Sequence, residues 1–408
     1  MAVAPDGTLY AGGSFTTAGG VPVNHIARWD GASWSALGSG VSGTDHTYVS
    51  ALAVAADGTL YAGGRFTHAG ATMVNYIARW DGTSWSKVGG GVSGGNDYWR
   101  GVSALAIAPD GILYVGGHFT SAGPILANNI AQWDGASWNA LGGGTDASVY
   151  SLAVAPDGTL YTGGLFTIAG GMPASYLAQW DGNEWGAIGS GANDSVRALA
   201  VAPDDALYAG GSFSTAGGVP ARHIARWDGS AWSVLGSGSG IPGSRFESGY
   251  IQALAASLDG TLYAGGDFTR VDGIAANHIA RWDGTAWNAL SSGLSCSCFE
   301  GTHVFALEVA PDALYVGGSF SHAGGSEASH IAQWDGASWS ALGGGINGTG
   351  LFTRVDALVV APDGTLYAGG NFTTAGGVPV NHIARWDGTS WSALGGGISG
   401  DAHPGVYD

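Results

Sequence analysis

The chain has 408 residues and a formal net charge of −18, from 13 Lys and Arg against 31 Asp and Glu. Such an acidic chain lacks the positive surface that nucleic acids and anionic membranes attract, so we expect neither nucleic-acid binding nor membrane insertion. Hydrophobic residues make up 45% of the chain, which excludes disorder, and no apolar run approaches the roughly 18 residues of a membrane span.

A Trp-Asp-Gly triplet recurs along the whole chain at intervals of 47 to 55 residues. Its tryptophans are Trp29, Trp80, Trp133, Trp180, Trp227, Trp282, Trp334 and Trp386. A period of about fifty residues is typical of propeller blades. No secretory signal precedes the first repeat, and the chain begins inside a repeat, as expected if a leader had been removed.

Four strands are expected in each repeat, as residues 51–89 illustrate. Residues 51–55 alternate Ala with Leu and Val, and an Asp-Gly turn leads into a second strand at 59–66 that contains paired glycines. A loop precedes the third strand at 76–80, and a second Asp-Gly turn leads to the fourth at 84–89. Both faces of these strands are largely apolar, which is typical of sheets packed between other sheets.

Eight such sheets predict an all-β fold, a closed eight-bladed β-propeller that forms one domain over residues 1–408. Ring closure removes exposed sheet edges. Val406, Tyr407 and Asp408 match the segment Val149–Ser151, so the two chain ends are in register, as expected if one first strand of a ring had been cut. An open superhelical array would not need complementary ends.

The repeat resembles the kelch repeat of galactose-oxidase-like propellers, in the form found in bacterial surface proteins. The paired glycines after "LYAGG", the Trp29–Asp30 pair and the second aromatic residue at Trp34 carry the resemblance, which covers the whole chain. The chain differs in using Trp where kelch repeats carry Tyr, and in a shorter "DGxxW" turn. The resemblance implies a propeller fold and partner binding, but no single activity.

Residues that recur in every repeat are interpreted as scaffold. We expect the sixteen repeated tryptophans to pack between sheets, and Arg28 with its Arg and Gln counterparts to hydrogen-bond between blades. The histidine column that includes His25 lies at strand starts, and its members are about 10 Å apart, too far to share one metal ion. Sixteen turn aspartates, Asp6 and Asp30 among them, serve turn chemistry on one face. We predict no cofactor and no metal.

The two cysteines, Cys296 and Cys298, form the segment "SCSCF". Residues two apart rarely reach disulfide geometry, and one isolated pair is a weak metal signal. We interpret them as free or incidentally oxidised loop thiols, whose redox state the sequence leaves open.

The loops between the fourth strand of one repeat and the first strand of the next vary most, and variable loops on a rigid scaffold usually carry specificity. Trp99 is the one tryptophan outside the repeat, and it is expected either to pack over a blade or to contact a ligand. The predicted ligand-binding residues are His46, Tyr48, Asp97, Tyr98, Trp99, Arg100, Tyr150, Arg245, Phe246, Tyr250, Phe299, Arg354 and Tyr407.

Aromatic residues with Arg, amides and acids suit glycans, and Tyr, Trp and Arg also form protein interfaces. The main hypothesis is a non-enzymatic, extracellular or cell-surface module that binds a glycan or protein. The first alternative is a polysaccharide hydrolase or lyase, which needs two placed carboxylates. Its candidates are Asp45, Asp97, Asp146, Glu247, Glu300 and Asp356. The second alternative is a structural protein that self-associates on a surface.

Overall fold

The computed structural model describes residues 1–95, 100–237, 250–296, 301–349 and 352–400. Over these residues the chain is all-β, which confirms the all-β part of the prediction, and none of it forms a helix that could span a membrane. The chain divides into two compact units. Unit 1 comprises Met1–Ala140 and Leu342–Asp408, and unit 2 comprises Leu141–Ala341.

Unit 1 holds four antiparallel four-stranded sheets within the described ranges. Their strands are β1 (Ala2–Val3), β2 (Leu9–Gly12), β5 (Ile26–Trp29) and β6 (Trp34–Ala36); β8 (Tyr48–Val54), β9 (Leu60–Arg65), β12 (Ile77–Trp80) and β13 (Trp85–Lys87); β15 (Gly101–Ile107), β16 (Leu113–His118), β19 (Ile130–Trp133) and β20 (Trp138–Ala140); and β47 (Arg354–Val360), β48 (Leu366–Asn371), β51 (Ile383–Trp386) and β52 (Trp391–Ala393).

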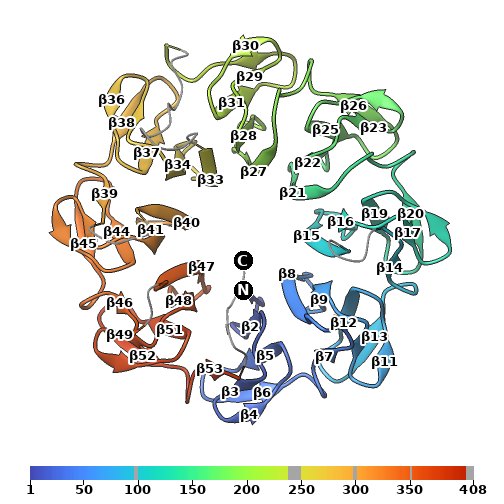
Figure 1. The fold of residues 1–408 in the computed structure, drawn as a ribbon, viewed down its shortest axis with the longest axis horizontal. Coiled ribbons are helices and arrows are strands. Elements are labelled where there is room, and N and C mark those ends of the chain that lie inside the picture. Colours follow the sequence, from blue (N-terminus) through green and yellow to red (C-terminus); the bar gives the residue numbers. More distant parts are fainter. Residues whose placement is uncertain (96–99, 238–249, 297–300, 350–351, 401–408) are drawn as a thin grey trace. The chain divides into compact units, whose positions relative to one another are not determined.

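Unit 2 also holds four such sheets among its described residues. Their strands are β21 (Val149–Val154), β22 (Leu160–Gly164), β25 (Leu177–Trp180) and β26 (Trp185–Ala187); β27 (Val196–Val201), β28 (Leu207–Gly211), β31 (Ile224–Trp227) and β32 (Trp232–Ser233); β33 (Tyr250–Ala256), β34 (Leu262–Asp267), β37 (Ile279–Trp282) and β38 (Trp287–Ala289); and β40 (His303–Ala310), β41 (Ala313–Ser319), β44 (Ile331–Trp334) and β45 (Trp339–Ala341). In Figure 1 the first strands β21, β27, β33 and β40 lie at one end of their sheets, and these successive strands contact one another.

The turn aspartates fix the hairpins locally. Asp57 Oδ1 accepts the backbone N–H of Thr59 at 2.9 Å, and Asp81 Oδ1 accepts the N–H groups of Thr83 and Ser84 at 2.9 and 2.8 Å. Such Asx turns provide a hydrogen-bond acceptor for backbone N–H groups of the turn that have no partner in the β-ladder. The predicted turn role of these aspartates is therefore what the structure shows.

The predicted loop between the second and third strands contains a small hairpin of its own. In unit 1 these hairpins pair with a short strand that follows the preceding sheet, as β10 pairs with β7. The strands concerned are β3 (Thr17–Ala18), β4 (Val21–Pro22), β7 (Val41–Ser42), β10 (His68–Ala69), β11 (Thr72–Met73), β14 (Val92–Ser93), β17 (Ser121–Ala122), β18 (Ile125–Leu126), β46 (Ile346–Asn347), β49 (Thr374–Ala375), β50 (Val378–Pro379) and β53 (Ile398–Ser399).

Among its described residues, unit 2 shows this pairing with a short strand for only one of its four hairpins. Its short strands are β23 (Ile168–Ala169), β24 (Met172–Pro173), β29 (Thr215–Ala216), β30 (Val219–Pro220), β35 (Arg270–Val271), β36 (Ile274–Ala275), β39 (Leu294–Ser295), β42 (His322–Ala323) and β43 (Ser326–Glu327). Strand β42 pairs with β39, whereas β23 and β29 make single bridges to Thr145 and Ala192. Where a hairpin pairs with a short strand inside one unit, it ties its sheet to the sheet before it through backbone hydrogen bonds.

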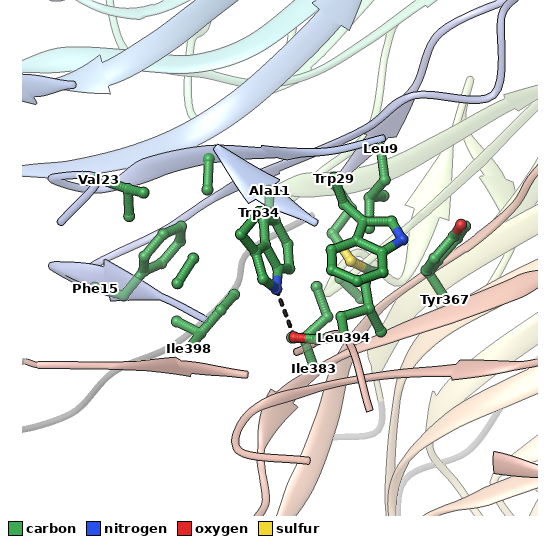
Figure 2. Close-up of a cluster of buried hydrophobic side chains, with 14 of the residues drawn as sticks. Leu9, Ala11, Phe15, Val23, Trp29, Trp34, Tyr367, Ile383, Leu394 and Ile398 are labelled. Atoms are coloured by element: carbon green, nitrogen blue, oxygen red, sulfur yellow. Dashed lines mark hydrogen bonds between the residues drawn. The ribbon is translucent and has the colours of Figure 1, made fainter. Parts of the chain in front are cut away.

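The tryptophan pairs form the seams between sheets, as predicted. Trp29 lies opposite Trp34 on neighbouring strands, with ring centroids 5.6 Å apart, and both side chains are buried. The Trp34 Nε1–H group donates to the carbonyl oxygen of Leu394, which lies at the end of another sheet of unit 1 (Figure 2). The second tryptophan of each of the other seven repeats makes the same bond, to the carbonyl of a Leu, Val or Ile that lies 44 to 52 residues earlier in the chain.

The paired glycines allow the sheets to approach each other. A Cβ on Gly63 would lie 2.5 Å from Val102 Cγ1 of the next sheet, and a Cβ on Gly64 would lie 2.3 Å from the carbonyl oxygen of Tyr48. Real Cβ atoms do not approach this closely, so both positions require glycine for packing.

The histidine column is structural. His25, Tyr76, Asn129, Tyr176, His223, His278, His330 and His382 all have positive φ, between 62° and 70°. Their backbone N–H groups donate to the carbonyl of a fully buried Phe, as His278 does to Phe268 at 2.7 Å. Asn and His tolerate this left-handed conformation better than most residues, which explains the column better than metal binding does.

The arginine column departs from the expectation of bonding between blades. Arg28 Nε donates to Ser35 Oγ at 2.8 Å, and Arg79 and Arg385 repeat this bond to Ser86 and Ser392, in each case within one sheet. Only Arg385 also reaches another sheet of unit 1, at Gly31 O. The planar group therefore mainly ties the third strand to the fourth, because the two residues are cross-strand neighbours.

Candidate variable-residue site

The first strand of seven described sheets carries a β-bulge at the same place. The ladder shifts register between a Val or Ile and an Ala or Ser, and one residue stands between them. The bulge residues are Ser50, Ser103, Tyr150, Arg197, Gln252, Phe305 and Asp356.

The scaffold fixes the backbone at each bulge but leaves the side chain free to differ. Ile251, the residue before the bulge of β33, lies close enough to the glycine pair of the preceding sheet that a Cβ on Gly210 would be 2.5 Å from its Cγ2 atom. The next residue is unpaired in the ladder, and bulges of this kind re-aim a side chain, often beside functional sites.

In unit 2 the four bulge residues, Tyr150, Arg197, Gln252 and Phe305, come from first strands that contact one another in sequence. We call them the bulge site. Tyr150 is 41% exposed, and Arg197 is exposed. They combine aromatic surface, one cation and one amide on rigid strands.

Aromatic contacts join the bulge site to the residues at the strand starts. The Arg197 guanidinium carbon lies 5.7 Å from the centre of the Tyr250 ring on the next sheet, which is a cation–π distance. The Phe305 ring stacks on His303, with centroids 5.8 Å apart and 20° between the planes. Tyr250 was predicted as a site residue, and these contacts bring it together with Arg197.

A buried carboxylate lies next to this group. Asp267 is 6% exposed and pairs across the ladder with Tyr250, and its Oδ1 atom is 3.9 Å from His278 Nδ1. Burial lowers the pKa of His278 to about 4, although its bond to the Gly266 carbonyl acts in the opposite direction. The imidazole is therefore neutral at physiological pH.

The bulge residues of unit 1 have different surroundings. Ser50 Oγ donates to the Val102 carbonyl on the next sheet at 2.6 Å, so this hydroxyl joins two sheets. Asp356 Oδ1 accepts a bond from Arg354 Nε at 2.7 Å. Burial raises the pKa of Asp356, and the Arg354 charge opposes that shift.

The structure distributes the predicted ligand-binding residues over several positions. His46 is exposed in a loop; Tyr48, Tyr250 and Arg354 start first strands; and Tyr150 is a bulge residue. Arg100 Nη2 donates to the Gly95 carbonyl at 3.0 Å. The remaining predicted residues, Asp97, Tyr98, Trp99, Arg245, Phe246, Phe299 and Tyr407, lie outside the described residues.

Sequence reasoning missed Arg197, Gln252, His303 and Phe305. The sequence comparison considered the composition of each loop as a whole. These four residues were not singled out by it, because each belongs to a first strand rather than to a loop. A signal was present in the aligned repeats. The position between Val or Ile and the pair Ala-Leu or Ser-Leu holds Ser, Tyr, Arg, Gln, Phe or Asp, whereas its neighbours hardly change.

The carboxylates considered for catalysis do not form a pair among the described residues. Asp146 accepts the N–H groups of Thr167 and Ile168 at 2.8 and 2.9 Å, so it holds two loops together. Asp356 is paired with Arg354, and Asp45 is exposed in its loop. Asp97, Glu247 and Glu300 lie outside the described ranges, within which no group of three His, Cys, Asp or Glu could hold a metal ion.

Cys296 is part of a disulfide, so of the two states expected for it, free or oxidised, the structure has the oxidised one. The other cysteine of the chain, Cys298, lies outside the residues that the structure describes. The two-residue spacing led us to expect a disulfide to be rare here, but chain spacing alone does not fix the geometry of a loop.

Three segments, residues 4–29, 258–282 and 361–386, match a family described as a domain of unknown function (DUF5122) with a β-propeller fold. Each segment runs from the end of a first strand to the first tryptophan of the same sheet. The repeat is therefore similar to a β-propeller repeat, while the kelch type specifically remains a resemblance. No curated protein matches the sequence.

Solved structures with low sequence identity are similar over most of the chain. The extracellular domain of BT3049 from B. thetaiotaomicron, titled a putative hybrid two component system, is 8% identical with a TM-score of 0.45, over 81% of this chain and 39% of that one. Virginiamycin B lyase from Staphylococcus aureus is 11% identical with a TM-score of 0.40, over 72% and 83%. The chain thus spans less than half the length of the first of these structures, and its strands have the all-β propeller repeat that the family match indicates.

Proposed function

We propose that the protein is a non-enzymatic binding module that works outside the cell or at its surface. The observation that carries this proposal is the bulge site, where one position on each rigid first strand differs from sheet to sheet. A scaffold that repeats while one column varies, exposed at Tyr150 and Arg197 and half-buried at Gln252 and Phe305, is the arrangement expected of a recognition surface.

A glycan is the ligand class that the bulge site favours. Tyr150 and Phe305 offer aromatic surface for a sugar ring, while Arg197 and Gln252 offer hydrogen-bond partners for hydroxyl groups. Their mixture, in place of one repeated ligand set, supports a single asymmetric site rather than equal sites on every sheet. A protein ligand, contacted by the same Tyr, Phe and Arg side chains, is the alternative outcome of the test below.

We also propose that the eight sheets close into one eight-bladed ring. Within unit 1, strand β53 near the C-terminus pairs with β3 near the N-terminus, which supports this closure. A ring of 408 residues has an expected radius of gyration of about 22 Å in solution scattering. A clearly larger value would indicate an open array.

The function is tested with a glycan array and a pull-down from extracellular material, using the wild-type chain and the variants Tyr150→Ala and Arg197→Ala. We expect each variant to weaken binding about tenfold, as for residues central to an interface. Arg222→Ala is the matched control, because Arg222 is also exposed but lies before β31, away from the bulge.

The outcomes separate the hypotheses. Loss of glycan signal in the two variants supports the glycan module, and the same loss for a captured protein supports the protein-binding form. Binding that is unaffected by both variants contradicts the bulge site. Cleavage of a bound polysaccharide would favour the hydrolase or lyase alternative, and concentration-dependent assembly without a ligand would favour the structural one.

A further inference from the structure

We propose that a cavity at the turn ends of two unit 2 sheets binds an alkylguanidinium or alkylammonium group. The cavity has a volume of about 720 Å³ and lies between the sheet that ends in β32 and the sheet that ends in β38. Its lining includes Asp204, Tyr208, Arg226, Leu258, Asp259 and Asp283. This inference does not depend on the bulge site, which lies at the other end of the same strands.

The cavity exists because this seam departs from the repeat. Strand β32 covers two residues, Trp232–Ser233, whereas the fourth strands of the other unit 2 sheets cover three. The bond from Trp287 Nε1 to Leu235 O is 3.3 Å long, while the same bond at the other seven seams measures 2.6 to 2.8 Å. The two sheets are therefore less closely joined here.

The arginine of the repeat has a different partner in this cavity. Arg226 Nη2 donates to Asp204 Oδ2 at 2.8 Å, in place of the serine bond that Arg28, Arg79 and Arg385 make. The adjoining turn also differs, since Asp205 (φ 61°) stands where most other turns have glycine. One wall of the cavity is thus an ion pair that is already neutralised.

Two further carboxylates leave the cavity negatively charged. Backbone N–H groups of Ala286 and Thr285, together with the Thr285 hydroxyl, lower the pKa of Asp283, and the N–H of Thr261 lowers that of Asp259. Both are ionised at neutral pH. Because Arg226 is the one cation among the described residues of the lining and is paired with Asp204, a cationic ligand fits and an anion does not.

The lining also offers an apolar contact for the stem of such a ligand. Leu258 is 92% exposed and stands where the other seven repeats have Pro or Ala before the turn aspartate. Leu235 and the edge of Trp282 also line the cavity. A charged head beside a short aliphatic stem describes both a free alkyl cation and the side chain of Arg or Lys on a peptide.

Binding is measured by isothermal titration calorimetry at 150 mM salt with n-butylguanidinium and with acetyl-Gly-Arg-Gly-amide. Butyrate and n-butanol are the anionic and neutral probes. The test variant is the double substitution Asp259→Asn/Asp283→Asn, in which the amide oxygens still accept the turn N–H bonds. The matched control is Asp312→Asn/Asp335→Asn, the same two turn positions on the sheet that ends in β45.

We expect at least one of the cationic probes to bind with one-to-one stoichiometry, and the test variant to weaken that binding about tenfold or more. Tighter binding of the peptide indicates a protein partner, and tighter binding of n-butylguanidinium a free cation. Equal weakening in the control variant would show a general effect of surface charge and overturn the proposal. So would binding that persists in the test variant, equal binding of butyrate or n-butanol, or no binding of either cation.

Discussion

The indole nitrogen of Trp34 donates a hydrogen bond to the carbonyl oxygen of Leu394, at 2.6 Å and 360 residues later in the chain. Its cross-strand neighbour Trp29 is equally buried, but Trp29 Nε1 has no hydrogen-bond partner in the described part of the chain. The two tryptophans of this pair therefore differ in one respect: the indole N–H of Trp34 makes a hydrogen bond, and that of Trp29 makes none with the described residues.

Trp34→Phe should destabilise the fold more than Trp29→Phe. Both substitutions shorten a buried aromatic side chain, but only the first removes a hydrogen bond, which costs about 0.5–1.5 kcal/mol because the Leu394 carbonyl keeps its second bond, from Gly397 N–H at 3.1 Å. Urea unfolding followed by circular dichroism gives the comparison. Equal losses in the two variants would show that the indole bond adds nothing to the seam.

Gly210→Ala should lower the free energy of unfolding by about 1–3 kcal/mol, because overpacking strains a close contact. A Cβ there would lie 2.5 Å from Ile251 Cγ2 and 2.9 Å from Ile251 Cβ. Gly143→Ala is the control, since its Cβ would come no closer than 3.7 Å to any other residue. If both variants melt at the wild-type temperature, the glycine is not required by packing.

His278 should make stability depend on pH between about 6.5 and 4. The folded protein lowers the pKa of this imidazole to about 4 by burial, whereas an exposed histidine titrates near 6.5. The unfolded chain therefore binds the proton first, so stability is complete above pH 6.5 and falls as the pH drops toward 4.

His278→Asn should flatten that part of the curve, because Asn129 occupies the same left-handed position with φ 62°. Asp267 and His303 face the ring and stay unchanged in the variant. Calorimetric melting temperatures from pH 4 to 8 provide the measurement. An unchanged slope in the variant would assign the dependence to another group.

Asp228 should contribute to loss of stability in acid. Backbone N–H groups of Ala231 and Ser230 lower its pKa to about 2. Because the folded protein lowers the pKa of this carboxyl, the stability that its ionised form contributes is present above about pH 4. That stability is lost as the pH falls toward 2. Asp228→Asn keeps an acceptor for the turn but cannot titrate, so the difference in melting temperature from wild type should shrink in that window.

Much of the fold could be predicted from the sequence because the relevant signals are local. The alternation in residues 51–55, the Asp-Gly turn at Asp57 and the left-handed residue before each third strand act within a few residues of themselves. Tyr150 and Tyr250 were predicted as site residues on their aromatic character alone, and that prediction remains to be tested by the variants above.

The bulge site could be predicted only in part, because a bulge is a relation between two strands rather than a property of one. Arg197 and Phe305 do not differ from ordinary strand residues until the ladder shifts register beside them. Likewise, the sequence alone does not distinguish Ser50 from an ordinary surface serine. Its role is seen only in the folded protein, where the Val102 carbonyl of the next sheet accepts a hydrogen bond from its hydroxyl.

By itself, then, the sequence determined the repeat, the four-stranded sheets and the turns, since short-range patterns and turn residues specify them. Only the tertiary structure decided which side chains share a site and where a cavity opens. Both depend on how closely residues about fifty positions apart approach, as the long Trp287–Leu235 bond shows. That spacing arises from packing between sheets, which no single repeat encodes.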